Sequence, residues 1–477
     1  MIELSRRRRL AVLAICCLSL LIVGLDTTIV NVALPSIHRE LHASVSGLQW
    51  TIDAYTLVLA SLLMLAGSTG DRVGRRRIFQ LGLVVFSAGS LLCGLAPSLG
   101  ALVAARVLQA IGGSMLNPVA MSIIRNVFED PRERAMAIGM WGAVFGLSLA
   151  LGPVVGGALV DAFSWRAVFF VNVPIGLAAI VLTALYVPES RAERLRRLDP
   201  VGQLLVIAGL AGLTFAIIEG PRAGWTSAQT LAVFAVAGLC LAALVPYELR
   251  RDAPLLEMRF FTSAPFSGAS AIAVMTFCAR GGFLFLTTLY LQNVRGLSPL
   301  EAGLYLLPMA AMILIFAPLS GRIIGRSGTR GPIVVAAAAI VVAAAMLTRL
   351  SPTTPTGYLL VSYVLFGIGM GLVNPPITNT AVSGMPPAQA GVAAAVASTS
   401  RQVGMTLGVA IIGAVAGGTL GASIGPSFAR ATHPGWWIVV GLGLAIGLLG
   451  ALTGGAWARE TARRTAERFR EPAGAAA

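Results

Sequence analysis

Apolar residues form long, nearly uninterrupted runs along this chain, and short polar segments separate them. A run of about 20 apolar residues is long enough to cross a bilayer as a helix. The pattern predicts fourteen membrane-spanning helices, at residues 10–34, 46–66, 77–96, 100–124, 134–159, 166–187, 200–218, 228–248, 265–292, 299–320, 331–349, 356–381, 389–417 and 434–457. Spans five, nine and thirteen are long, so we expect them to tilt or bend.

Composition supports a membrane protein, and the basic residues predict its orientation. The chain is 56% hydrophobic and 12% charged, whereas soluble domains carry about 25% charged residues. All 35 basic residues are arginines, and 26 of them lie in the N-terminus, in alternate loops and in the C-terminal tail. Basic loops stay cytoplasmic, so we expect a multi-pass membrane protein with both termini cytoplasmic. The all-Arg, Ala- and Gly-rich usage indicates a GC-rich bacterial genome, so we expect the membrane to be the bacterial inner membrane. This topology accounts for the net charge of +15 and leaves no soluble basic domain for nucleic acid.

Several other classes of function lack their sequence signals. The five cysteines all fall within spans, which argues against a disulfide framework. The three histidines lie in outer loops without metal-ligand spacing, and no nucleotide-binding motif is present. We therefore expect no metal, no cofactor and no enzymatic activity.

An internal repeat predicts the architecture. The segment Gly70–Arg75 has a degenerate copy at Gly321–Arg326, 251 residues later, and Ile111–Pro118 has a copy at Ile368–Pro375, 257 residues later. Paired helical repeats around a midplane site are typical of secondary transporters. We expect an all-α fold of 6+2+6 helices, divided into an N-terminal bundle at 1–190, a two-helix insertion at 191–258, a C-terminal bundle at 259–458 and a cytoplasmic tail at 459–477.

Three charged residues in the first half mark the candidate chemistry. A charged side chain at membrane depth costs at least about 2.5–3.5 kcal/mol on insertion scales and is usually functional. Asp26, Asp53 and Arg106 fall in spans one, two and four, each about 10 Å below the outer edge. A buried carboxyl that can lose and regain its charge is a natural proton carrier. We expect Asp26 to couple protons, Asp53 to couple protons or bind cationic substrates, and Arg106 to act with them; the alternative is a static ion pair that fixes helix packing.

Four motifs resemble those of a known family. Gly67–Arg77 resembles the loop between spans two and three of the major facilitator superfamily, and Arg106–Gly112 resembles its fourth-helix motif. Gly146–Gly157 resembles the fifth-helix motif of antiporters, and Leu25–Pro35 the first-helix motif of 14-spanner drug:proton antiporters. Asp53, in its Trp-Thr-Ile-Asp-Ala-Tyr context, resembles the exporters of quaternary ammonium drugs.

The resemblance implies gating roles for two of these segments. The loop would latch the two halves in the outward-open state, and the fifth helix would bend and pack tightly. The residues concerned are Gly70, Asp71, Arg72, Gly74 and Arg75 in the loop, and Gly146, Gly152, Pro153 and Gly156 in the fifth helix. In the second half Arg322 replaces Asp71, which implies different gating roles in the two halves.

The remaining candidates concern the substrate. Aromatic and Met side chains suited to a flat cation are Trp50, Tyr55, Phe145, Tyr290, Tyr305 and Met309, although packing is the ordinary role of each. Arg280 and Arg401 are further intramembrane charges that should point inward. Each arginine either contacts the substrate or pairs with another group of the protein in a structural role. An arginine close to the substrate would disfavour cationic drugs.

These patterns predict a proton-driven antiporter that exports cationic or lipophilic drugs by alternating access, working as a monomer in the lipid bilayer. One alternative is a dedicated exporter of a single antibiotic or metabolite. Another, of a different class, is a membrane sensor or lipid-handling scaffold that transports nothing. The segment 458–470 has Glu460/Arg464 and Arg463/Glu467 at i,i+4 spacing, which predicts a short surface helix.

Overall fold

A computed structural model describes six stretches of the chain, residues 5–192, 199–251, 254–383, 390–418, 427–453 and 455–469. Within them the regular structure is helical, and the helices supply fourteen segments long and apolar enough to cross a membrane. This confirms the predicted number of spans and the all-α class with 6+2+6 helices. Position 389, where span thirteen was expected to begin, and residues 470–477 of the expected tail lie outside these stretches.

The contacts divide the chain into two compact units. Unit 1 comprises residues 1–203 and 291–307, and unit 2 comprises residues 204–290 and 308–477. The repeat predicts a different division of the chain, with boundaries at residues 190 and 258, and that division stays a prediction.

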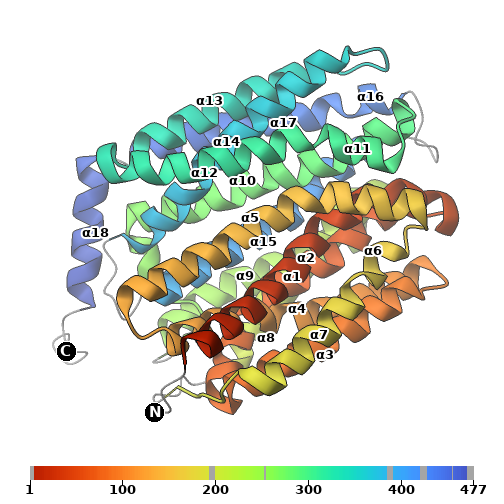
Figure 1. Cartoon of the computed structure of the whole chain (residues 1–477). Coiled ribbons are helices and arrows are strands. Elements are labelled where there is room, and N and C mark those ends of the chain that lie inside the picture. The colour runs from red at the N-terminus through yellow and green to blue at the C-terminus, as the bar shows by residue number, and fades with distance from the viewer. Residues whose placement is uncertain are drawn as a thin grey trace. The chain divides into compact units, whose positions relative to one another are not determined.

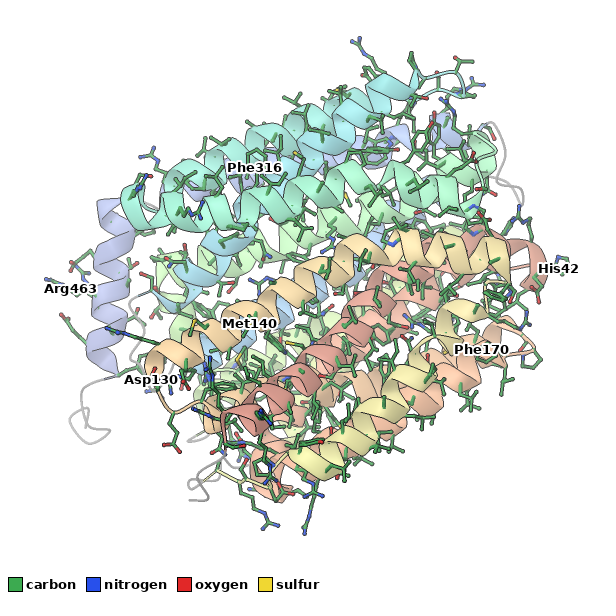
Figure 2. The ribbon with its side chains drawn as sticks, viewed as in Figure 1. His42, Asp130, Met140, Phe170, Phe316 and Arg463 are labelled. Atoms are coloured by element: carbon green, nitrogen blue, oxygen red, sulfur yellow. The ribbon has the colours of Figure 1, made fainter. Side chains whose placement is uncertain are left out.

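Unit 1 contains the first six spans and one short helix from later in the chain. Its helices are α1 (Arg6–Leu41), α2 (Val45–Val73), α3 (Arg75–Gly94), α4 (Leu99–Val127), α5 (Pro131–Ala162), α6 (Ala167–Phe170), α7 (Asn172–Tyr186) and α11 (Pro299–Tyr305). Helices α3 and α7 pack on each other, and α4 packs on both α2 and α3 (Figure 1). His42 and Phe170 lie at one end of this unit and Asp130 at the other (Figure 2).

Unit 2 contains most of the remaining helices. These are α8 (Pro200–Ala223), which begins in unit 1, α9 (Ala228–Leu249), η1 (Met258–Thr262), α10 (Ala264–Leu289), α12 (Leu307–Ser327), whose first residue belongs to unit 1, α13 (Arg330–Leu347), α14 (Thr356–Val382), α15 (Ala390–Gly418), α16 (Phe428–Ala431), α17 (His433–Thr453) and α18 (Ala456–Arg468). The turn η2 (Tyr290–Val294) crosses the boundary, with Tyr290 in unit 2 and the rest in unit 1. Helix α18 runs across the end of this unit, with Arg463 pointing away from it (Figures 1 and 2).

The helices differ from the apolar runs mainly at their ends, because capping groups extend them into polar sequence. The Ser5 hydroxyl accepts a bond from the Arg8 amide at the start of α1, and His42 adopts a left-handed conformation at its end. Span nine, predicted to bend, passes from α10 into the π-helical turn η2. Span ten is broken at Leu306, between α11 and α12.

Glycines let equivalent helix pairs approach closely in the two units. A Cβ on Gly112 of α4 would lie within 3.0 Å of α3 backbone, and a Cβ on Gly369 of α14 would lie 2.8 Å from the Ala336 carbonyl of α13. The internal repeat pairs α4 with α14, since Gly112 and Gly369 lie within its two matching segments. Close packing through small residues is typical of membrane helices.

The C-terminal surface helix predicted from charge spacing is present as α18. Its Glu460 and Arg464 are 3.0 Å apart, and Arg463 and Glu467 are 3.7 Å apart. The Thr461 hydroxyl accepts a bond from the Ala264 amide at 3.0 Å, which fixes α18 to the start of α10.

Candidate functional site

Asp26 and Arg106 form a buried ion pair between α1 and α4. Nη1 of Arg106 donates to Oδ2 of Asp26 at 2.5 Å, the range of a charge-assisted bond. The two side chains are 0% and 1% exposed. Of the two aspartates predicted to share a layer with Arg106, Asp26 is the one that binds it.

Two amide side chains donate to the other oxygen of the Asp26 carboxylate. Nε2 of Gln109 lies 2.8 Å from Oδ1, and Nδ2 of Asn172 lies 3.3 Å from the same atom. Both amides also donate to the hydroxyl oxygen of Ser90, at 3.2 and 3.1 Å, and that hydroxyl donates to the Phe169 carbonyl. The Asp26 charge therefore lies in a network that joins α1, α3, α4 and α7.

Arg106 is held from several further directions. Its Nε donates to the carbonyl of Thr51 in α2 at 3.1 Å, and its Nη1 also donates to Oε1 of Gln109 at 2.7 Å. The guanidinium carbon lies 4.2 Å from the ring centre of Tyr55. A guanidinium over an aromatic face is attracted by the ring quadrupole. Arg106 would thus keep a defined position if Asp26 gained a proton and released it.

Asp53 lies apart from these hydrogen bonds although it shares α2 with Thr51. Its carboxylate is 0% exposed, and its one described bond comes from the Thr56 hydroxyl to Oδ1 at 3.4 Å. Its Oδ2 is buried and has no hydrogen-bond partner among the described residues. A buried carboxylate without a cation is costly, so this group is suited to carry a proton or meet a cationic ligand.

Sequence reasoning missed the neutral members of the Asp26 network. Gln109 lies three residues after Arg106, which places both on one face of α4. That spacing was a usable signal. Asn172 and Ser90 gave no comparable signal, because short polar residues are common where membrane helices pack.

The predicted aromatic and Met candidates are divided between the two units. Tyr55 stacks on Arg106, and the Phe145 ring lies beside Gly24 of α1. The buried Tyr290 donates its hydroxyl to the Ser351 carbonyl at 2.7 Å, so it stabilises a turn of unit 2. Trp50 and Tyr305 are half-buried in unit 1, and Met309 is buried in unit 2.

The loop between α2 and α3 is bound to the segment that follows α7. The carbonyl of Asp71 accepts a bond from the Ala192 amide at 3.0 Å, and the Arg75 amide donates to the Ser190 carbonyl at 2.9 Å. The Asp71 carboxylate accepts from Nε of Arg75, also at 2.9 Å. Gly74 has a φ of 129°, and a Cβ there would lie 2.7 Å from the Glu189 carboxylate. The glycine is therefore needed both for the turn and for the approach of Glu189.

Other loop and fifth-helix candidates have packing contacts. A Cβ on Gly70 would lie 2.8 Å from Val119 of α4, and Arg72 lies in the last turn of α2. Gly152 packs on Thr28 and Gly156 on Ile29, so both bring α5 against α1. Gly146 and Pro153, also on α5, complete the predicted set.

A neighbouring face of α5 contacts α11, which lies in the same unit. A Cβ on Gly157 would lie 2.5 Å from the Pro299 carbonyl, and Gly303 faces the Pro153 carbonyl. The Leu300 amide donates to Oδ2 of Asp161 at 3.0 Å. The fifth helix is therefore packed on two sides through small residues.

Arg280 of α10 and Arg401 of α15 lie in unit 2, where both approach the ring of Phe277. Arg401 donates to the Thr378 hydroxyl. Neither arginine has a carboxylate partner among the described residues.

Comparison with known proteins assigns the family. The Major Facilitator Superfamily profile matches residues 16–409. The chain is 39% identical over 389 residues to the multidrug resistance protein Stp of Mycobacterium tuberculosis, covering 82% of this chain and 72% of that protein. It is 38% identical over 385 residues to the tetracenomycin C resistance and export protein of Streptomyces glaucescens, covering 80% and 71%.

A solved structure shares the fold. The crystal structure of a bacterial homologue of the human lysosomal transporter Spinster matches with a TM-score of 0.66 at 19% identity, over 98% of this chain and 100% of that chain. The chain therefore belongs to the Major Facilitator Superfamily and is a multi-pass membrane transporter.

Proposed function

We propose that this protein is a proton-driven antiporter that exports cationic or lipophilic drugs across the bacterial inner membrane by alternating access. The observation that carries the proposal is the buried Asp26–Arg106 pair, a titratable charge at membrane depth whose partner cannot lose its own proton. The names of the relatives, multidrug resistance and antibiotic export proteins, support export of drug-like molecules.

The proposed coupling step is proton transfer to Oδ2 of Asp26. Protonation there would remove the charge that holds Arg106, while Gln109 and the Thr51 carbonyl would still bind the guanidinium. Arg106 would then carry an unbalanced positive charge in a site that excludes water. Opening the site to water would relieve that charge, and drug binding in place of the proton would reverse the step.

We assign to Asp53 the role of extending transport to cationic substrates. Its unpartnered Oδ2 could hold a second proton or face a cationic drug. Export of a monovalent cation against one proton is electroneutral. A dication needs two protons for the same balance, or the membrane potential opposes its export by about 2.3 kcal/mol per charge per 100 mV.

The gating proposal uses the loop at Gly70–Arg75 and the glycines of α5. The loop is bound through Asp71 and Arg75 to residues 190–192, so movement of α2 would be transmitted to the segment that follows α7. The small residues of α5 would let it slide against α1 and α11. The aromatic candidates named above would line the drug path.

The proposed topology places both termini in the cytoplasm, with the protein acting as a monomer. The arginine asymmetry between alternate loops supports this orientation.

The experiment is efflux of a fluorescent cation from proteoliposomes under an imposed pH gradient. Wild-type protein should show pH-driven flux, and Asp26→Asn should lose it. Asp161→Asn is the matched control, because that carboxylate binds the Leu300 amide at the end of α5 and has no arginine partner among the described ion pairs. Flux that ignores the pH gradient would refute the coupling.

A dedicated exporter of one antibiotic is the second candidate, and the relative named for tetracenomycin C favours it. Competition assays separate the two. A dedicated exporter would ignore ethidium and other unrelated cations, whereas a multidrug exporter would be inhibited by several of them.

A further inference from the structure

Arg280 lies on α10, the repeat counterpart of α1, close to the position expected for a counterpart of Asp26. It lies 254 residues after Asp26, between the repeat offsets of 251 and 257. The helix pairs correspond as well, because α1 packs on α5 and α10 packs on α15. The first span of each repeat therefore carries one buried charge, which is acidic in α1 and basic in α10.

Arg280 lacks the compensation that Asp26 has. Its side chain is 5% exposed, and its Nε has no hydrogen-bond partner among the described residues. Its described contact is with the Phe277 ring, whose centre lies 5.8 Å from the guanidinium carbon. The hydroxyl of Thr276, one helical turn earlier, is also buried and unpartnered in the described structure.

Arg401 brings a second guanidinium to the same ring. Its guanidinium carbon lies 6.0 Å from the centre of Phe277, and its Nε is likewise buried without a partner among the described residues. Close approach of α10 and α15 places the two arginines together, since a Cβ on Gly281 would lie 2.6 Å from the Met405 carbonyl.

The helices α10, α12, α13, α14, α15 and α17 carry no acidic residue that could neutralise the pair. Between residues 264 and 459 the chain contains one acidic residue, Glu301, and its carboxylate caps the start of α11 by accepting a bond from the Ser298 amide. Arginine stays protonated in proteins, so the two charges cannot be removed by deprotonation. Buried charges in proteins are normally paired.

We propose that Arg280 and Arg401 bind the anionic group of an exported substrate, with Phe277 stacking on an adjoining aromatic ring. Guanidinium groups are suited to carboxylates, whose two oxygens they bind with defined geometry. Both residues lie near the middle of their spans, at the depth where secondary transporters bind substrate. The substrate class is aromatic carboxylates and related anions, including zwitterions. This inference rests on the proposed export function and widens its substrate class beyond cations.

The test uses one rhodamine dye in two forms, the free carboxylate and its methyl ester, in proteoliposomes under a pH gradient. The dyes differ only in the anionic group. Arg280→Gln and Arg401→Gln should each reduce transport of the carboxylate form about tenfold or more, because each removes a charge-assisted bond. Transport of the ester should be maintained or increased. Arg349→Gln, an exposed arginine at the end of α13, should leave both dyes unaffected.

The proposal would be overturned if the variants reduced transport of the two dyes equally, or reduced transport of neither dye. Detergent-solubilised wild-type protein supplies a readout that needs no variant to fold. It should bind the carboxylate form about tenfold more tightly than the ester by fluorescence anisotropy, and equal binding would also overturn the proposal. Loss of pH-driven transport of both dyes by wild-type protein would instead refute the export function.

Vesicle composition distinguishes substrate from lipid as the source of the anion. The arginine dependence should be present in vesicles of phosphatidylcholine alone. Dependence that appears only after phosphatidylglycerol is added would assign the site to an anionic lipid headgroup and overturn the substrate assignment.

Discussion

Among the described residues Asp26 is the carboxylate paired with Arg106, so replacing it by Asn leaves a guanidinium buried among neutral groups. Both side chains are at most 1% exposed, so solvent cannot compensate. Removal of one partner from a buried pair typically costs about 3–5 kcal/mol. The Gln109 and Thr51 bonds to Arg106 remain, which places the expected loss near the lower end, about 3 kcal/mol.

The informative variant combines Asp26→Asn with Arg106→Gln. Replacing both charges removes the unpaired cation, so most of the lost stability should return. Transport coupled to protons should not return, because the carboxylate that is proposed to carry the proton is gone. The two single variants and the double variant form a double-mutant cycle. Thermal unfolding in detergent measures their stability, and pH-driven efflux in proteoliposomes measures their proton coupling.

An exposed pair of equal length is the control. Arg9 and Glu133 also lie 2.5 Å apart, but their side chains are 27% and 40% exposed. Exposed pairs contribute about 0–1 kcal/mol, so Glu133→Gln should change stability little. If the double Asp26/Arg106 variant regains both stability and proton-coupled efflux, the pair is a static packing device and the coupling argument is refuted.

Three further predictions concern other parts of unit 1. Asp53→Asn should reduce export of dications more than monocations in a vesicle transport assay, and equal reduction would refute the assignment of Asp53 to substrate charge. Gly152→Ala should destabilise the α1–α5 contact, because its Cβ would overlap the Thr28 hydroxyl, whereas Gly139→Ala on the same helix has open space and should be neutral in thermal unfolding. Equal melting temperatures for these two variants would contradict the packing argument. Gly74→Ala should cost about 1–3 kcal/mol and slow transport, because φ is positive there, and unchanged turnover would remove the loop from the gating proposal.

The elements could be predicted from sequence because the bilayer imposes a strict length and polarity on each span. Fourteen apolar runs became fourteen spanning segments for that reason. Breaks inside a span could not be predicted. The interruption at Leu306 falls on an apolar residue, and the π-helical turn at Tyr290–Val294 is a change of backbone hydrogen bonding, so hydropathy reports neither.

That Asp26 and Arg106 lie at one level could be predicted from sequence, but the rotation of each helix could not. Helix direction placed Asp26, Asp53 and Arg106 in one layer, yet residue counting cannot tell which carboxylate faces the arginine. The structure pairs Arg106 with Asp26 and leaves Oδ2 of Asp53 without a described partner. The role of neutral groups such as Asn172 could not be predicted either, because it depends on which helix face meets Asp26.

Proton movement driven by drug is the measurement that tests the central claim most directly. Proteoliposomes containing an entrapped pH indicator are loaded with a cationic drug and diluted into drug-free buffer without a pH gradient. Outward drug flow through the wild-type protein should carry protons inward and acidify the interior, and Asp26→Asn should abolish that signal. Drug efflux without acidification of the interior would contradict the account.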